Sequence, residues 1–296
     1  MSHRWGIDLG GTKIEGVVLP EGSVEPLCRM RVATEADRGY EHIVSRIVAL
    51  VEQMEAETGI ARPARIGVGT PGAAEPSTGR MKNCNSTALN GQPLPADLSA
   101  SLGVEAVVAN DANCFALAEA TLGAAKDAEV VFGVIMGTGV GGGIVVHGRV
   151  LGGAQGIAGE WGHNVLDPEG DPCYCGRRGC VETVLSGPSL ERFYFRISGE
   201  RRRLPEIVAR RGSDPHADAT MERLFAKFGE ALGVVVNILD PDVVVLGGGV
   251  GNIADLRTRG RDELAKHVFN PELRTQLRAP TLGDSAGVFG AAMLVA

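Results

Sequence analysis

Hydrophobic and polar residues follow two different periods in the N-terminal part of the chain. Residues 4–19 contain two strand-like apolar runs on either side of Gly10 and Gly11, which predicts a β-hairpin. A third strand is expected over residues 27–32. The apolar residues between positions 39 and 58 then recur with the period of a helix. One face of that helix is expected to hold Ile43, Ile47, Leu50, Val51 and Met54.

Strands and helices alternate in the segments that follow. The sequence "ARIGVGTPG" at residues 64–72 predicts a short buried strand that runs into a Gly/Pro turn, and "EAVVAN" at residues 105–110 predicts another strand. "DANCFALAEATLG" predicts a helix that begins at Asp111 and ends near Gly123. This alternation is typical of an α/β fold.

The same pattern begins again near Val130. "EVVFGVIMGTGVGGGIVVHGRV" is once more strand, glycine-rich turn and strand, and a loop-rich segment follows over residues 151–187. A clear helix is expected over residues 218–239, followed by the strand "DVVVLGGG" and a helix through His267. The repetition predicts two similar lobes that face one cleft. Their expected extents are residues 1–117, completed by the C-terminal helix at 284–296, and residues 118–283.

Composition excludes some partners and compartments. The chain has 296 residues, enough for two domains, and a formal net charge of −7, which argues against nucleic acid or an anionic membrane surface as main partner. No stretch resembles a signal peptide or a membrane span, so we expect a cytoplasmic protein. In that reducing compartment, the six cysteines are interpreted as thiols or metal ligands before disulfides.

The glycine-rich turns suggest phosphate binding, because glycine lets backbone N–H groups approach an anion closely. "GGTK" is not a Walker A loop, since Thr12 and Lys13 stand in reverse order and a strand follows. Gly137, Gly139 and Gly142 have Rossmann spacing, yet there too the chain continues as a strand. What remains is a phosphate site made from two hairpin turns, with the glycines after "VVVL" as a third contact. The alternative is that these are merely tight hairpins.

A cluster of cysteines is the most specific motif. Cys173, Cys175 and Cys180 have C-x-C-x4-C spacing, and His163 lies ten residues before the first of them. Three thiolates and one imidazole form a closed tetrahedral set, which predicts a structural rather than a catalytic zinc ion. A disulfide and free thiols are the alternatives.

Asn110 and Asp111 lie where a predicted strand ends and a helix begins. Asp is a favoured N-cap residue and helix N-termini attract carboxylates, so one interpretation of Asp111 is purely structural. Transfer of a phosphoryl group to a hydroxyl also needs a carboxylate that orients the hydroxyl and accepts its proton. The position of Asp111 suits that second role.

Taken together, "GIDLGGTKIEG", "ANDANC", "GTGVGGG", "GEWGHN", "CYCGRRGCVE" and "VVVLGGG" resemble the ROK family of sugar kinases over essentially the whole chain. The resemblance implies an α/β, two-lobed, actin-like (ribonuclease H-like) fold with a cleft between the lobes. It also implies an ATP-dependent hexose kinase that uses Mg²⁺ and carries Zn²⁺.

The resemblance further implies roles for individual residues. Asp111 is the expected catalytic base, and Asp8 is expected to hold Mg²⁺ through water; the alternative for Asp8 is a carboxylate that caps the turn. The residues expected at the sugar are Gly72, Asn85, Asn110, Asp111, Glu160, His163 and Glu182, of which Glu160 and Glu182 have the alternative of solvated surface charge. The residues expected at the nucleotide are Asp8, Gly10, Gly11, Thr12, Lys13, Gly137, Thr138, Gly139, Gly141, Gly142, Gly247, Gly248 and Gly249. The zinc ligands are His163, Cys173, Cys175 and Cys180.

The segments "NSTALNGQPL" and "GEWGHN" resemble most the fructokinase and mannokinase branch, so the predicted reaction converts fructose to fructose 6-phosphate. Kinases of N-acetylglucosamine, mannose or glucose are the alternatives within the family. Family members that repress transcription carry an added helix-turn-helix domain, for which the first hairpin leaves no room. A sugar-binding protein without catalysis is opposed by the intact Asp111 and phosphate turns. The resemblance implies a homodimer with no nucleic-acid or membrane partner.

Overall fold

The computed structural model describes residues 2–296. The chain folds into two compact units. Unit 1 comprises the residues up to Asp127, Gly143–Ala158 and Thr281–Ala296, and unit 2 comprises Ala128–Gly142 and Gly159–Pro280. This division differs from the expected boundary at residue 117, because that position lies inside a helix that stays whole in unit 1. The segment 143–158 also joins unit 1, where its strand packs on the same helix.

Unit 1 is built on a five-stranded mixed sheet with the order β3-β2-β1-β4-β7. Its strands are β1 (His3–Leu9), β2 (Lys13–Pro20), β3 (Cys28–Ala33), β4 (Arg65–Thr70) and β7 (Glu105–Asn110). The expected hairpin is confirmed, since β1 and β2 pair antiparallel with Leu9 opposite Ile14. Strands β1, β4 and β7 are parallel to one another. Their carboxyl ends therefore meet at one edge of the sheet.

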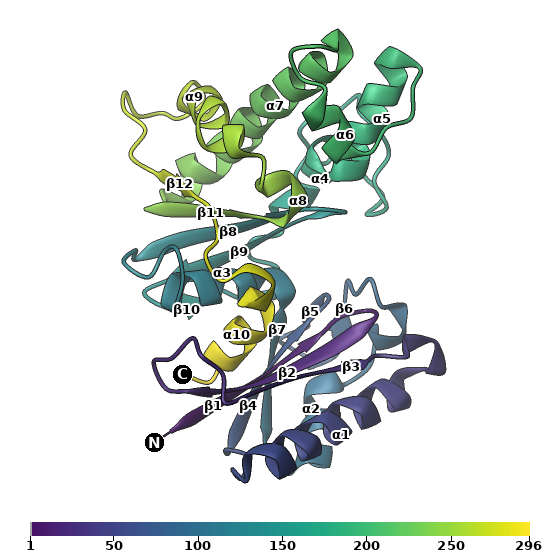
Figure 1. The fold of residues 1–296 in the computed structure, drawn as a ribbon, viewed down its shortest axis with the longest axis vertical. Helices are drawn as coiled ribbons and strands as arrows, with labels where there is room; N and C mark the ends of the chain where they lie inside the picture. The colour runs from purple at the N-terminus through teal and green to yellow at the C-terminus, as the bar shows by residue number, and fades with distance from the viewer. Residues whose placement is uncertain (1) are drawn as a thin grey trace. The chain divides into compact units, whose positions relative to one another are not determined.

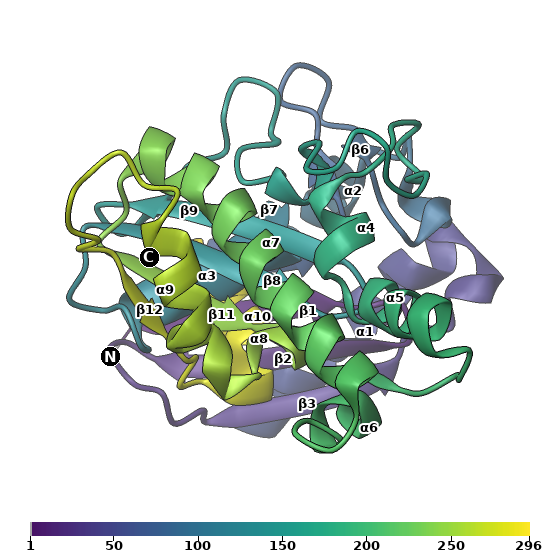
Figure 2. The same ribbon diagram turned by 90° about the horizontal axis from the view of Figure 1, so that it is seen from above.

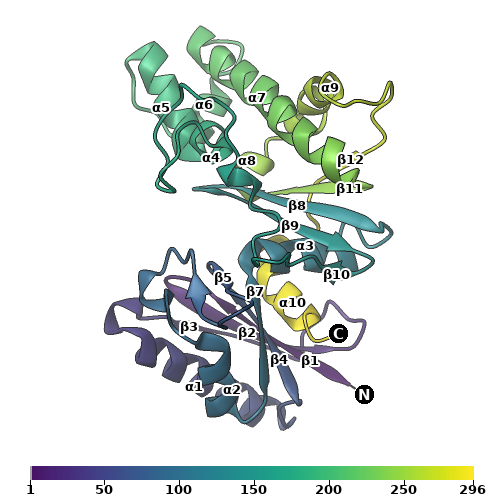
Figure 3. The ribbon, with the colours of Figure 1, turned by 180° about the vertical axis from the view of Figure 1, so that it is seen from behind.

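Helices cover both faces of this sheet (Figures 1 and 3). On one face lie α1 (Tyr40–Thr58) and α2 (Leu94–Leu102), and on the other α10 (Ala286–Met293), which packs on α3 (Asp111–Thr121). The helix α10 can approach because the sheet carries glycine there: a Cβ on Gly67 would stand 1.7 Å from the carbonyl oxygen of Ala291. The apolar face expected for α1 is confirmed, since those five side chains are fully buried.

Several short elements of unit 1 were not predicted from the sequence. They are α2, the paired strands β5 (Ala73–Ala74) and β6 (Met81–Lys82), and the 3₁₀ turns η1 (Ala36–Arg38), η2 (Thr87–Leu89) and η5 (Gly283–Ser285). Helix α2 has two prolines at its start, which favour a turn, and only three buried leucines mark its helical period. The other elements are too short to show any period.

Unit 2 contains most of a second five-stranded sheet, with the order β10-β9-β8-β11-β12. Its strands are β8 (Val130–Met136), β9 (Val140–Val146), β10 (Arg149–Val150), β11 (Val243–Gly247) and β12 (Gln276–Arg278). Strands β8 and β11 are parallel, and their register sets Gly247 opposite Ile135. The glycines that end β11 are thereby brought beside the glycine turn that follows β8.

Helices make up the rest of unit 2, and Figure 2 shows the long α7 with α9 beside it. They are α4 (Val181–Leu185), α5 (Gly187–Ser198), α6 (Leu204–Ala209), α7 (Pro215–Leu239), α8 (Gly248–Gly251) and α9 (Arg259–Ala265), with 3₁₀ turns η3 (Trp161–His163) and η4 (Ala254–Arg257). Helix α7 begins before the expected residue 218, because Asp214 caps it with bonds from two backbone N–H groups. None of the helices in residues 2–296 combines the length and apolar character that crossing a bilayer requires.

Candidate active site

The first glycine turn, Gly10 to Lys13, is held from outside by a threonine. The Gly10 N–H donates to the carbonyl oxygen of Lys13 at 2.9 Å, which closes the turn. The hydroxyl of the buried Thr34 donates to the Gly10 carbonyl at 2.7 Å, and its N–H donates to the Thr12 carbonyl at 3.0 Å. Gly11 and Thr12 stay exposed, so the tip of the turn is open to a ligand. No motif singles out Thr34, because it comes two strands after the turn, directly after β3.

Asp8 lies near the end of β1, at the sheet edge where the parallel strands end. Burial raises the pKa of its carboxyl to about 6; the nearby carboxylates of Asp111 and Glu15 add to the increase, and Lys13 opposes it. The start of α10 packs closely against the Asp8 carboxylate: a Cβ added to Gly287 would lie 3.0 Å from Asp8 Oδ2. Asp8 is thus a confined carboxylate whose charge lacks sufficient compensation within the chain.

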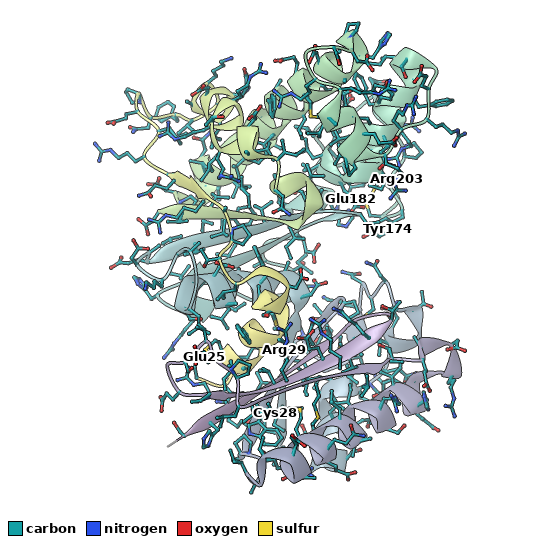
Figure 4. All side chains as sticks on the ribbon, in the orientation of Figure 1. Glu25, Cys28, Arg29, Tyr174, Glu182 and Arg203 are labelled. Atoms are coloured by element: carbon teal, nitrogen blue, oxygen red, sulfur yellow. The ribbon has the colours of Figure 1, made fainter. Side chains whose placement is uncertain are left out.

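The third carboxylate, Glu15, is already paired. Its side chain is buried and accepts from Arg29, labelled in Figure 4, and from Arg31 Nε at 2.7 Å. The ammonium of Lys13 lies 3.9 Å from Glu15 Oε2 and is itself half exposed. Glu15 therefore belongs to a structural ion cluster of β2 and β3, and Asp8 and Asp111 remain as the pair that can act on a ligand.

Asp111 is the first residue of α3, directly after β7. The side chain of Asn110 is the N-cap, because its Oδ1 accepts from the Ala112 N–H at 2.9 Å. Asp111 Oδ1 also accepts from that N–H, at 2.8 Å. Asp111 is exposed at the surface of unit 1. Desolvation by the surrounding protein raises the pKa of its carboxyl, while the hydrogen bonds from Ala112 and Asn110 lower it. Asn110 and Asp111 therefore share the Ala112 N–H at the helix start, and the role of Asp111 as a base stays a prediction.

The other expected sugar residues of unit 1 lie on the loop after β4. Asn110 Nδ2 donates to the Gly72 carbonyl at 3.2 Å, which ties this loop to the end of β7. Gly72 has a φ of 85° and no room for a Cβ, which would stand 2.5 Å from the Lys82 carbonyl. Asn85 is exposed in the loop between β6 and η2. Gly72 and Asn110 are thus joined, and much of the hydrogen-bonding capacity of Asn110 is used within the chain.

The cysteine cluster of unit 2 has the geometry of a tetrahedral metal site. The donor atoms of His163, Cys173, Cys175 and Cys180 all lie within 4.8 Å of one another. Cys173 Sγ is 3.6 Å from His163 Nδ1, and Cys175 Sγ is 3.6 Å from Cys180 Sγ. Zinc–sulfur bonds of about 2.3 Å in a tetrahedron separate two sulfurs by roughly 3.8 Å. The residues therefore fit Zn²⁺, and none of the cysteines forms a disulfide.

Tyr174, between the first two cysteines, was not among the expected residues. Its hydroxyl lies 3.0 Å from His163 Nε2, the ring nitrogen that points away from the cluster, and the two rings meet edge to face. Tyr174, labelled in Figure 4, is 76% exposed as a whole residue. Partial desolvation raises the pKa of Tyr174 to about 12, and the charge of Glu182 contributes. No motif marks this residue, because its neighbours come together only when the loop folds.

The expected glutamates flank the cluster in the chain. Glu160 directly precedes η3, whose last residue is His163. Glu182 stands in the first turn of α4, close after Cys180. Its Oε2 accepts from the Val140 N–H at 2.9 Å, so the carboxylate is bound to the glycine turn rather than solvated as free surface charge.

The second glycine turn, Gly137 to Gly139, joins β8 to β9. Its neighbours Gly141 and Gly142 lie within β9, where a Cβ on Gly142 would meet the ring of Phe132 at 2.8 Å. Gly248 has a φ of 81° and lies against the end of β8, since its Cβ would stand 2.4 Å from the Met136 carbonyl. Unit 2 thus brings together the turn after β8 and the Gly247–Gly249 segment, as expected of parts of one nucleotide site.

Comparison with known proteins agrees with these features. Residues 4–296 match the family model described as the ROK family. The chain is 35% identical over 301 residues to the N-acetyl-D-glucosamine kinase of Aliivibrio salmonicida and 36% identical to that of Vibrio cholerae, with 98% of each chain covered.

Solved structures give the same result. A ROK hexokinase from Thermus thermophilus has a TM-score of 0.89 at 33% identity, covering 99% of this chain and 97% of that one. A ROK family glucokinase from Streptomyces griseus, solved with glucose and AMPPNP, has a TM-score of 0.78 at 28% identity and covers 99% of both chains. These matches confirm the expected α/β fold of the actin-like class. The chain belongs to the ROK family.

Proposed function

We propose that this protein is an ATP-dependent hexose kinase, which transfers the γ-phosphate of ATP to a sugar hydroxyl. One observation carries the proposal: Asp8 and Asp111 are two carboxylates with raised pKa values at the ends of parallel strands, beside an open glycine turn, with Asp8 half-buried and Asp111 exposed to a ligand. Ligands of α/β proteins bind at such strand ends. A raised pKa in such a place is typical of a group that works on a ligand.

Asp111 is the proposed base. The oxygen of the sugar hydroxyl attacks the γ-phosphorus, the bond from phosphorus to the bridging oxygen of ADP breaks, and the hydroxyl proton passes to the Asp111 carboxylate. A carboxylate with a raised pKa accepts a proton more readily than one with an ordinary pKa, and the bond from the Ala112 N–H holds the Asp111 side chain in place.

Asp8 is the residue proposed to face Mg²⁺. A hard cation with oxygen ligands suits a confined carboxylate whose charge is poorly compensated, and Mg²⁺ keeps several waters in such sites. The ion supplies neutralisation of phosphate charge. The exposed tips of the turns at Gly10–Lys13 and Gly137–Gly139, with Gly247–Gly249, are proposed to donate backbone N–H groups to the nucleotide.

The residues proposed to contact the sugar are Glu160, His163 and Glu182, and also Gly72, Asn85 and Asn110. Zinc held by His163, Cys173, Cys175 and Cys180 would organise a loop that has little core of its own. With Nδ1 directed at the metal, His163 presents Nε2 as its remaining group, which Tyr174 now contacts.

For the sugar itself, we infer that N-acetylglucosamine is the first candidate, because relatives at 35–36% identity over 98% of the chain carry that activity in their names. Fructose is the second candidate, favoured by the segments "NSTALNGQPL" and "GEWGHN". Glucose and mannose complete the set, since glucose is the ligand of the Streptomyces griseus structure.

The decisive experiment measures MgATP-dependent ADP release with each sugar, for the wild type and for Asp111→Asn. The variant is expected to lose about 10²–10⁴-fold in kcat on the preferred sugar, with sugar binding retained. Asp37→Asn, an exposed carboxylate of unit 1, is the matched control and should keep wild-type turnover. If folded, zinc-replete protein binds a sugar but releases no ADP with any of the sugars, the result would favour a non-catalytic sugar-binding protein. Light scattering of the same sample tests the expected homodimer.

A further inference from the structure

The short helix α4 connects two features that are distant in the sequence. It begins directly after the zinc ligand Cys180, and its first-turn residue Glu182 accepts a hydrogen bond from the Val140 N–H at 2.9 Å. Two residues past its end, the Gly187 N–H donates to the carbonyl oxygen of Gly137 at 2.8 Å. Residues 137–141, here called the phosphate turn, are therefore bonded to α4 or its flank at both the Gly137 and the Val140 positions.

The other arm of the metal cluster contacts the same turn. His163 is the last residue of η3, and Trp161, the first residue of η3, donates from Nε1 to the Gly141 carbonyl at 3.1 Å. Between them, Gly162 packs so closely on the turn that a Cβ would stand 2.0 Å from the Val140 carbonyl oxygen. The segments that carry His163 and Cys180 thus both rest on the phosphate turn.

The glycine at the centre of the turn makes room for the carboxylate. A Cβ on Gly139 would stand 2.6 Å from Glu182 Oε2. Any larger residue at position 139 would displace the Glu182 carboxylate, so close packing against Glu182 requires glycine there, in addition to any approach of phosphate. A glutamate that only contacted sugar would not require this close packing against the turn.

We propose that Glu182 is a positioning residue that couples zinc binding to nucleotide binding, so that each strengthens the other. Zinc holds Cys180 and with it the start of α4, which places the Glu182 carboxylate under the Val140 N–H. A turn held in one conformation loses less entropy when it binds phosphate. By linkage, the nucleotide must then tighten zinc by the same factor. The inference rests on the proposed function, because it takes the phosphate turn as an ATP contact.

The test compares AMPPNP affinity, measured by calorimetry with Mg²⁺ present, for zinc-loaded and zinc-stripped protein. The wild type should bind AMPPNP at least about fivefold more tightly with zinc. In Glu182→Ala that ratio should fall towards one, whereas Glu182→Gln, whose amide oxygen can still accept from Val140, should retain most of it. The ratio of AMPPNP affinities with and without zinc is the readout. The absolute AMPPNP affinity is not used, because removing the negative charge of Glu182 beside a phosphate site changes it directly.

A reciprocal measurement covers the case in which zinc removal unfolds the protein. Zinc release from the folded holoprotein to a chelator is followed with and without AMPPNP. The nucleotide should slow release in the wild type and in Glu169→Ala, an exposed glutamate of the same loop, but not in Glu182→Ala. Equal slowing in all three proteins, or a zinc-independent AMPPNP affinity in the wild type, would refute the coupling through Glu182. Absence of AMPPNP binding by the zinc-loaded wild type would instead refute the proposed function, and this inference with it.

Discussion

Replacing Asp8 by asparagine should stabilise the protein while it abolishes turnover. The carboxylate is half-buried and lies near the charges of Asp111 and Glu15, so its ionised form is disfavoured in the folded state. Asparagine has nearly the same shape and carries no charge. The variant therefore removes an electrostatic cost of folding, and it also removes the group proposed to face Mg²⁺.

The size and sign of the effect follow from the pKa. It rises from 3.8 to about 6 on folding, and each unit is worth about 1.36 kcal/mol, so the ionised Asp8 costs about 3 kcal/mol of folding free energy. Because the folded pKa is raised, folded Asp8 binds a proton between about pH 4 and 6 that the unfolded chain does not bind. The contribution of Asp8 to stability thus falls as pH rises through that window. Above about pH 6 the whole cost is present, and below about pH 4 it vanishes.

The assay is urea unfolding of zinc-loaded protein without Mg²⁺ or nucleotide, at several pH values from about 4.5 to about 8, which span the window of the raised pKa. In a Trp161→Phe background, fluorescence of the remaining Trp5, fully buried in the same strand as Asp8, reports on unit 1. The free energy of unfolding should be higher for Asp8→Asn by up to about 3 kcal/mol at about pH 8, with the gap closing towards about pH 4.5. Asp37→Asn, an exposed aspartate, should stay within about 0.5 kcal/mol of the wild type at every pH. An Asp8→Asn protein that is no more stable than the wild type at the alkaline end, or whose gap does not depend on pH, would refute the reasoning.

Three further outcomes are expected. Tyr174→Phe frees His163 Nε2 from its hydroxyl partner, so the KM for the preferred sugar should fall a few-fold with kcat unchanged, as steady-state kinetics would show. Glu119→Ala removes a fully buried side chain that accepts from the N–H groups of Ala124, Thr281 and Leu282, which should cost about 2–3 kcal/mol in chemical unfolding; a loss under about 1 kcal/mol would contradict this. Cys175→Ser should lose zinc by metal analysis and lower the melting temperature, and chelation should lower the wild-type Tm by a similar amount.

Much of the fold follows from local pattern. Hydrophobic periodicity or a glycine-rich turn at one end marks these elements in the sequence. They are the hairpin of β1 and β2, the buried face of α1 and the strands β4, β7, β8 and β11. The proposed zinc ligands belong to the same class, because short spacing and residue type alone restrict four donors to one loop. Elements without a period, such as α2 and the paired β5 and β6, could not be predicted in this way.

The working properties of the site depend on tertiary structure. Asp8 and Asp111 are distant in the sequence and meet only because β1, β4 and β7 pair in parallel, and the raised pKa of Asp8 arises in part from that meeting. The bond from Val140 to Glu182 likewise crosses 42 positions. A sequence shows which residues can carry charge or bind metal. How strongly a charge is felt depends on burial and on neighbours within a few ångströms, which only long-range packing decides.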